Sequence, residues 1–173
     1  MAYLIRTMPK SEQNAEVFFK MNYIPCYLPR YNRVYINSFT GRNGKKYAYK
    51  RPPVLSPMFP GYIFAALDLD TMSQVRKSRS IAQVCLYTNY TEEELVTDLH
   101  KVQEFEFLAK NNQVEIRQDI QEGKLIVIKR GIFKGWEGVV ERRIDHNFIF
   151  VRIKTIGVSI GVECAAVDCD VME

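Results

Sequence analysis

The feature that most constrains the fold is a run of short apolar segments toward the end of the chain. Each segment is rich in β-branched or aromatic residues, as strands are, and Gly, Asp or Asn residues separate them. A sheet of such short strands leaves two exposed edges unless it closes, so the pattern predicts a small closed β-barrel. The expected strands are residues 125–129, 139–144, 148–154 and 158–164, with a fifth candidate at 169–172.

A glycine-rich turn follows the first of these segments. Residues 124–142 read KLIVIKRGIFKGWEGVVER, and the three glycines permit the positive φ values of a tight, bulged turn. Two interpretations of the apolar side chains in this turn stay open. Either they cap the end of the barrel core, or Phe133 and its neighbours form an exposed anchor for a partner protein, because aromatic residues at loop tips make effective hot spots. The side chains concerned are Ile132, Phe133, Lys134 and Trp136.

The first part of the chain alternates strand-like and helix-like segments. Ser11 is a good N-cap residue, and Thr91 with Glu94 forms a capping box, so each indicates the start of a helix. The dense apolar run at 58–67 suits a central strand that is buried on both faces. The expected strands are 3–8, 58–67 and 81–87, and the expected helices begin after Ser11, at Asp70 or Thr71, and at Thr91.

This order of elements predicts an α+β sandwich, in which helices cover the faces of a mainly antiparallel sheet. Residues 111–121 are polar and lack a sustained apolar period, so they are interpreted as the connection to the barrel. The expected organisation is therefore an N-terminal domain at 1–111, a linker at 112–121 and a C-terminal domain at 122–173.

Charge is distributed unevenly along the chain, although the net charge is only +4. Residues 1–56 hold ten Lys or Arg but only two acids, whereas residues 112–173 hold nine basic and ten acidic residues. This asymmetry indicates that the first region faces a polyanion, for which nucleic acid is the main candidate.

The most basic stretch, residues 30–51, has seven Lys or Arg and no acid, and a turn at 41–44 predicts that it forms a hairpin. Its aromatic side chains could stack on unpaired bases while the cations hold the phosphate backbone. Equally, the tyrosines could pair across the strands and only stabilise the hairpin, so both interpretations stay open. The aromatic residues are Tyr31, Tyr35, Phe39, Tyr47 and Tyr49, and the candidate nucleic-acid-binding cations are Arg42, Lys45 and Lys46.

The sequence disfavours several classes of protein. It has no long apolar run and no basic-then-apolar start, so we expect neither a membrane span nor a signal peptide, and a cytoplasmic location. The spacing of the four cysteines and two histidines fits no zinc pattern, so no metal or other cofactor is expected. We do not expect an enzyme, because no nucleotide-binding fingerprint or catalytic triad pattern occurs, and a strand end and helix cap explain Asp68 and Asp70.

Two motifs resemble a known family. The GIFKGWEG turn with the VVE that follows resembles a KOW motif, and FPGYIF at 59–64, between a basic hairpin and the Arg-Ser-Ile at Arg79, resembles the N-terminal domain of NusG proteins. Because both motifs occur in order, the resemblance extends from Tyr3 to about Val171. It implies an N-terminal α/β sandwich and a C-terminal SH3-like barrel. The lack of a Trp before Tyr3, and Arg6 where an aromatic residue is common, favour a specialised paralogue similar to RfaH.

The resemblance also implies where a protein partner binds. In this family the N-terminal domain binds the clamp helices of RNA polymerase, through an apolar cavity lined by the FPGY strand. The alternative is that these residues are ordinary core, since alternation along a strand puts Tyr62 and Phe64 on one face and Ile63 on the other. The implied polymerase-binding residues are Phe59, Pro60, Tyr62, Phe64 and Leu99, with Thr71 and Ser73 in the segment that reaches the polymerase gate loop in specialised relatives.

A second set of residues matches positions where relatives approach upstream or non-template DNA. Basic side chains neutralise phosphates without reading sequence, so they would give salt-sensitive binding of low specificity. The alternative is a solvated basic face. The set comprises Lys10, Arg76, Lys77 and Arg79.

These observations favour a transcription elongation or antitermination factor that acts as a monomer on specific operons. In this hypothesis the N-terminal domain binds polymerase and either DNA or nascent RNA, while the KOW domain recruits a ribosomal protein or the termination factor Rho through Phe133. The alternative is a ribosome-associated or RNA-binding KOW protein that needs no polymerase. The β-rich segments 125–129 and 148–154 favour a permanent barrel over one that refolds into helices, as in some specialised relatives.

Overall fold

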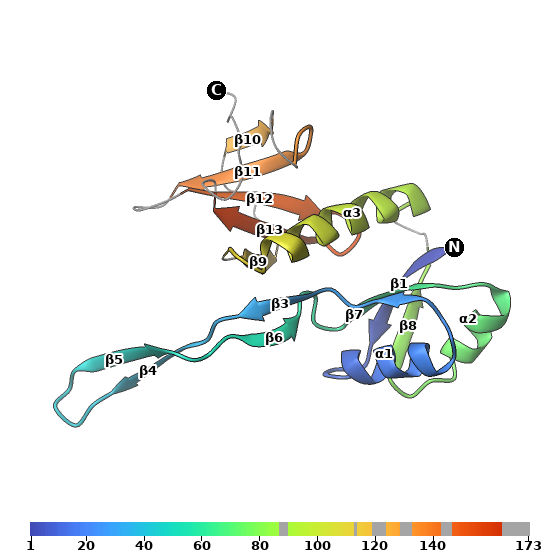
Figure 1. Ribbon diagram of the computed structural model, residues 1–173, viewed down its shortest axis with the longest axis horizontal. Helices are drawn as coiled ribbons and strands as arrows, with labels where there is room; N and C mark the ends of the chain where they lie inside the picture. Colours follow the sequence, from blue (N-terminus) through green and yellow to red (C-terminus); the bar gives the residue numbers. More distant parts are fainter. Residues whose placement is uncertain (87–89, 113, 119–123, 129–132, 143–146, 164–173) are drawn as a thin grey trace.

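The computed structural model describes residues 1–86, 90–112, 114–118, 124–128, 133–142 and 147–163 (Figure 1). The N-terminal part is built on a four-stranded antiparallel sheet in the order β2-β7-β1-β8. The segment predicted to be a central strand supplies β7, which lies between two neighbours as expected. The strands are β1 (Ala2–Thr7), β2 (Cys26–Tyr27), β7 (Tyr62–Ala66) and β8 (Ile81–Cys85).

Helices cover both faces of this sheet, as the predicted α+β sandwich requires. One face packs on α1 (Glu12–Met21) and α2 (Leu69–Val75), through a core that includes Phe19 of α1 and Ile63 of β7. The other face packs on α3 (Glu92–Leu108), through a core that includes Phe64 of β7. The antiparallel sheet is therefore the middle layer of the N-terminal part.

The predicted capping chemistry is confirmed in full at α3 and in part at the other two helix starts. At α3, the Glu94 N–H donates to Thr91 Oγ1 at 3.2 Å and the Thr91 N–H donates to Glu94 Oε2 at 2.9 Å, which is the expected capping box. Helix α2 starts slightly earlier than predicted, because Asp68 rather than Asp70 caps it. Ser11 occupies the N-cap position of α1, although its side chain makes no capping hydrogen bond.

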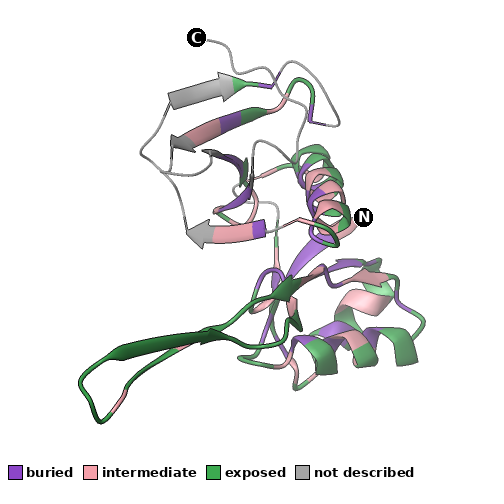
Figure 2. Ribbon diagram, turned by 60° about the vertical axis from the view of Figure 1, so that its left-hand side comes forward, coloured by how far each residue is buried: buried purple, intermediate pink, exposed green. Residues whose placement is uncertain are grey.

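A long two-stranded arm projects from the N-terminal part (Figure 1). Its root is formed by β3 (Arg30–Arg33) paired with β6 (Val54–Pro57), and its distal ribbon by β4 (Ile36–Thr40) paired with β5 (Lys46–Lys50). Figure 2 shows that most of the arm is exposed. The hairpin predicted from the turn at 41–44 is confirmed.

The C-terminal part is a five-stranded antiparallel sheet in the order β10-β11-β12-β13-β9. Four of the five expected segments are confirmed as strands, and the fifth, 169–172, lies outside the described residues. The remaining strand comes from the expected linker, where β9 pairs with β13. The strands are β9 (Val114–Gln118), β10 (Lys124–Val127), β11 (Glu137–Arg142), β12 (Asn147–Ile153) and β13 (Val158–Glu163).

The interpretation of 112–121 as linker is therefore wrong over β9. Val114 and Ile116 alternate with polar residues, which is the period of a half-buried strand, and Val114 is buried. This alternation is hard to recognise in the sequence, because it rests on two apolar residues only and the residues on either side are polar.

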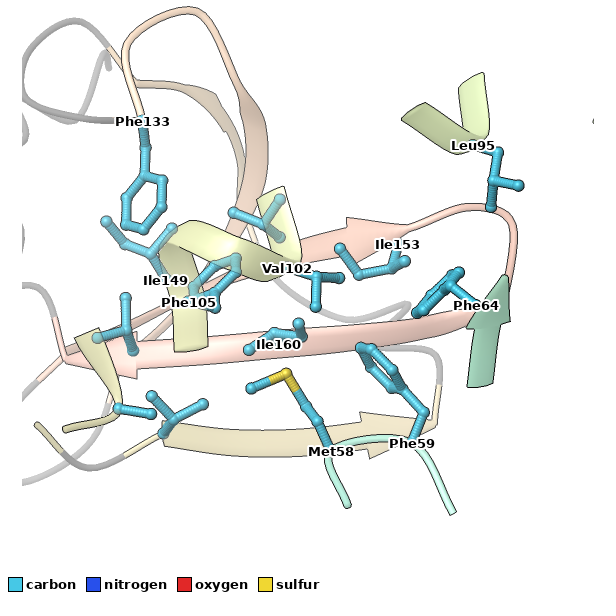
Figure 3. Packing of buried hydrophobic residues seen from close by; sticks show 14 of the residues in the cluster. Met58, Phe59, Phe64, Leu95, Val102, Phe105, Phe133, Ile149, Ile153 and Ile160 are labelled. Atoms are coloured by element: carbon cyan, nitrogen blue, oxygen red, sulfur yellow. The ribbon is translucent and has the colours of Figure 1, made fainter. Parts of the chain in front are cut away.

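Helix α3 lies between the two sheets (Figure 1). Its buried residues join both sides into one hydrophobic cluster, which explains why the C-terminal sheet does not stand apart from the rest of the chain. Figure 3 shows the members that meet there: Phe59 and Phe64 from the N-terminal part, Leu95, Val102 and Phe105 from α3, and Phe133, Ile149, Ile153 and Ile160 from the C-terminal part.

Candidate functional site

The FPGY motif forms a tight turn that leads into β7. Gly61 has a φ of +88°, a conformation that side chains other than glycine rarely adopt, and no atom lies near the position of an added Cβ. The Gly61 N–H donates to the carboxylate of the buried Glu12 at 2.6 Å, and its carbonyl accepts from the Thr7 N–H at 2.8 Å. Helix α1 and strand β1 therefore hold this turn in place. Glu12 was not singled out in the sequence, since an acid in a first helical turn is common at the surface.

The strand that follows alternates as predicted. Ile63 faces α1 and α2, whereas Phe64 and the half-buried Tyr62 face α3. Phe59 packs edge-to-face on Phe64, with ring centroids 6.4 Å apart. Phe59 and Phe64 are 2% and 3% exposed, so both rings are buried in this arrangement.

The remaining residues of the implied polymerase-binding set keep more exposure. Pro60, at the tip of the turn, is exposed, and Leu99 of α3 is half-buried against the same cluster. The structure thus brings the FPGY turn, β7 and α3 together into one apolar surface, and the C-terminal sheet covers it.

Phe133 also packs on α3 and is 1% exposed. Its ring stacks on Phe105 at 4.8 Å and packs on Trp136 at 4.6 Å. The expected exposed anchor is therefore buried here, because a helix from the other half of the chain supplies an aromatic partner that the turn itself could not reveal. Lys134 is exposed, Trp136 is half-buried, and Ile132 lies outside the described residues.

A buried acid of α3 adds a polar contact to this interface. Asp98 is 3% exposed; its Oδ2 accepts from the Thr155 N–H at 2.9 Å, in the turn between β12 and β13, and its Oδ1 lies 3.2 Å from Lys101 Nζ. A buried carboxylate is unfavourable unless it is paired and hydrogen-bonded, so this contact favours one orientation of the helix on the sheet. Sequence reasoning missed it, because an acid three residues before a Lys is typical of an exposed helix face.

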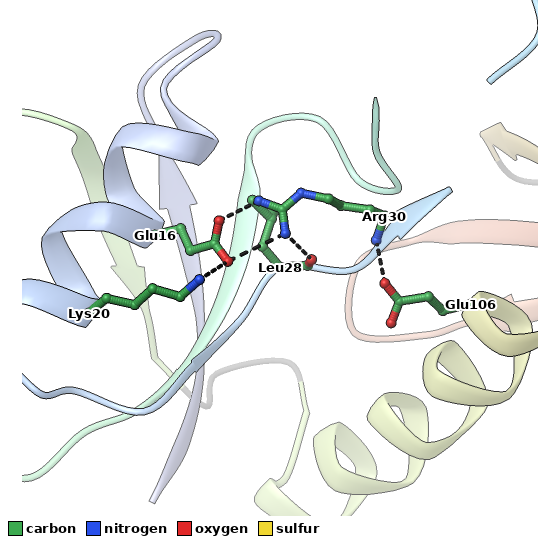
Figure 4. Close-up of polar contacts among 5 residues, drawn as sticks. All are labelled: Glu16, Lys20, Leu28, Arg30 and Glu106. Carbon is green, nitrogen blue, oxygen red and sulfur yellow. Dashed lines mark hydrogen bonds and ion pairs between the residues drawn. The ribbon is translucent and has the colours of Figure 1, made fainter. Parts of the chain in front are cut away.

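A second acid of α3, Glu106, links this helix to Arg30 at the root of the arm (Figure 4). Glu106 accepts from the Tyr27 hydroxyl at 2.6 Å. It also accepts from the Arg30 N–H at 2.8 Å, the bond drawn in Figure 4. The Arg30 guanidinium pairs with Glu16, which also accepts from Lys20 at 2.8 Å. These hydrogen bonds with Arg30 lower the pKa of Glu16, while burial and the bond to Glu106 raise the pKa of Tyr27.

The basic residues matched to DNA-facing positions all lie at one end of the N-terminal sheet. The Met8 N–H donates to the Ser80 carbonyl at 2.9 Å, which places the segments carrying Lys10 and Arg79 side by side. Arg76 and Lys77 follow α2 directly. All four cations are exposed: Lys10, Arg76, Lys77 and Arg79.

The two hydroxyl residues of α2 differ in their surroundings. Thr71 is engaged in the cap of its own helix, since its N–H and its hydroxyl both donate to Asp68 Oδ1, at 2.8 and 2.7 Å. These bonds lower the pKa of Asp68. Ser73 is exposed, so it is the freer of the two to meet a partner.

The described part of the chain meets the requirements of neither a metal site nor a membrane-spanning helix. No group of three His, Cys, Asp or Glu there could hold a metal ion, and none of its helices is long and apolar enough to cross a bilayer. Cys26 and Cys85 are free and half-buried, and Cys164 and Cys169 lie outside the described residues.

Comparison with known proteins identifies relatives of this fold. The family model described as "NusG: Transcription termination factor nusG" matches residues 3–106, which is more than half of the chain. The solved structure described as "Domain interaction in Thermotoga maritima NusG" has a TM-score of 0.56 with this chain at 15% sequence identity, over 99% of this chain and 97% of that one. No curated protein matches.

Proposed function

The chain belongs to the NusG family of non-enzymatic transcription factors, and from that premise we propose that it is an elongation or antitermination factor that binds RNA polymerase. The observation that carries the proposal is the apolar surface shared by the FPGY turn, β7 and α3, all within the segment that the family model matches. An apolar surface of this kind, when uncovered, is suited to docking on another protein. Phe59, Pro60, Tyr62, Phe64 and Leu99 are the proposed contacts.

The C-terminal sheet has a second, separate role in this proposal. Its five antiparallel strands and its GIFKGWEG turn support its interpretation as an SH3-like KOW barrel. It would recruit a ribosomal protein or Rho through Phe133, with Ile132, Lys134 and Trp136 beside it. Because Phe133 and the polymerase-binding surface both pack on α3, the sheet must move off the helix before either partner binds.

Two further contacts complete the proposed complex. The exposed cations Lys10, Arg76, Lys77 and Arg79 would neutralise phosphates of upstream or non-template DNA, which needs no sequence readout. Ser73, with Thr71, would face the gate loop of the polymerase. We further propose that the chain is a specialised paralogue that acts in the cytoplasm on particular operons.

Transcription in vitro through a pause or terminator tests the proposal. The protein should increase read-through, and Tyr62→Ala should reduce both that effect and polymerase binding by about tenfold or more, as removal of an interface aromatic does. Tyr23→Ala is the matched control, because Tyr23 is 95% exposed and lies after α1, outside the proposed surface. Read-through that is identical with and without the protein would refute the proposal.

The second candidate is a ribosome-associated or RNA-binding KOW protein, which the basic arm favours. It predicts co-purification with ribosomes that resists high salt and does not need polymerase. A factor that reaches ribosomes only in the presence of a transcribing polymerase would exclude this candidate.

A further inference from the structure

The distal ribbon of the arm carries its aromatic residues on one face. Its register pairs Phe39 with Tyr47 and Asn37 with Tyr49, and residues two apart on a strand point to the same side. Phe39, Tyr47 and Tyr49 are 55%, 43% and 50% exposed. These rings are therefore not part of a hydrophobic core. Burying them would stabilise the ribbon, because a two-stranded hairpin is only marginally stable on its own.

The rings are nevertheless held in fixed positions. Phe39 stacks on Tyr47 with centroids 5.4 Å apart and planes 21° apart, and it meets Tyr49 edge-on at 6.5 Å. The Asn43 amide donates to the Tyr47 hydroxyl at 2.9 Å, and the Asn37 amide lies 3.1 Å from the Tyr49 hydroxyl. Cross-strand pairing is thus present, but it leaves the aromatic face open. Rings fixed in this way lose little conformational freedom when a ligand binds.

Cations surround this face, and acids are absent from it. No Asp or Glu occurs between Glu16 and Asp68 in the sequence. Strand alternation places Lys45 and Arg51 on the aromatic side, with Lys46 and Lys50 on the opposite side of a ribbon that is only two strands wide. None of the three lysines forms a salt bridge within the described part of the chain. The charge of the arm therefore complements an anion.

We propose that the aromatic face of the β4–β5 ribbon binds single-stranded nucleic acid. Unpaired bases stack on Phe39, Tyr47 and Tyr49, and Lys45 and Arg51 meet the phosphates, a combination that suits single strands of any sequence. A duplex fits the face poorly, because its bases are already stacked on one another. This site is separate from the polymerase contact proposed above and does not depend on it.

The test uses the full-length chain without polymerase and follows the fluorescence anisotropy of short labelled oligonucleotides. The wild type should bind single-stranded RNA or DNA more tightly than the matching duplex. The double variant Phe39→Ala, Tyr49→Ala should weaken single-strand binding about tenfold or more, as expected when base stacking is removed. Tyr47→Phe, which keeps the ring, should retain most of the affinity, and Tyr23→Ala should leave it unchanged.

Salt dependence separates stacking from charge. The double variant Lys45→Gln, Arg51→Gln should flatten the plot of log affinity against log salt by up to roughly 0.7 for each phosphate that is no longer neutralised, whereas the aromatic variant should keep the wild-type slope. The same oligonucleotides identify the source of the ligand: a preference for RNA points to a transcript, and a preference for DNA points to a displaced strand.

Three results would overturn the proposal. One is an aromatic variant that folds, as judged by circular dichroism, and binds single strands like the wild type; a purely electrostatic basic face would give this result. Another is duplex binding as tight as single-strand binding. The third is an absence of oligonucleotide binding while arm variants weaken polymerase binding, which would mean that the arm docks on protein.

Discussion

At the scale of single residues, Asp98 and Phe133 hold the C-terminal sheet on α3 by different means. Stacking of Phe133 on Phe105 contributes about 1 kcal/mol beyond the burial of its area. The carboxylate of Asp98 satisfies the Thr155 N–H, a donor that would otherwise lose its partner. Of the two residues, Asp98 is the better one to substitute first, because its removal leaves the aromatic packing in place.

Asp98→Ala should weaken the interface by about 1–3 kcal/mol, since the Thr155 N–H and Lys101 are both left without the carboxylate. Trp136, the single tryptophan of the chain, reports the change because it packs on Phe133 and lies 6.2 Å from Phe105. Its fluorescence emission should shift to the red as the sheet leaves α3 and water reaches the indole. Glu93→Ala, an exposed acid of the same helix, is the control. An unshifted emission spectrum for Asp98→Ala would argue that Asp98 does not hold the interface.

At the scale of elements, the FPGY turn shows how a local backbone requirement shapes the candidate site. Gly61→Ala should cost about 1–2 kcal/mol, because alanine is strained at a φ of +88°. Gly157 provides a matched control: its φ is +76°, an added Cβ would also meet nothing within 4 Å, and it lies in the turn after β12. Urea unfolding should give both variants similar decreases in stability. Polymerase binding should fall for Gly61→Ala and not for Gly157→Ala, and equal binding of the two would count against a role for the turn.

Helix α3 shows both what the sequence could predict and what it could not. Its start followed from Thr91 and Glu94, because a capping box is local chemistry. Its place between two sheets did not follow, because the apolar spacing of Leu95, Val102 and Phe105 marks a buried stripe without saying which elements bury it. The contacts of Phe133 were hidden for the same reason. Long-range partners depend on how the two halves meet, and no local pattern encodes that.

At the scale of the whole molecule, the two surfaces assigned to partners both pack on α3 and are buried in one hydrophobic cluster. A protein whose binding-competent form is only a fraction of the population shows an affinity reduced by that fraction. The proposed factor should therefore bind polymerase less tightly than its N-terminal surface alone would allow. Changes that loosen the C-terminal sheet should strengthen the binding.

The affinity of the cognate RNA polymerase for the wild type, Phe133→Ala and Tyr62→Ala tests this mutual burial most directly. Phe107→Ala is the control, since Phe107 is a 64% exposed aromatic residue of α3 outside the shared cluster. Mutual burial of the two surfaces predicts tighter binding by Phe133→Ala, weaker binding by Tyr62→Ala and no change for Phe107→Ala. If Phe133→Ala and Tyr62→Ala both bind polymerase with the wild-type affinity, that result would contradict the mutual burial of the two surfaces.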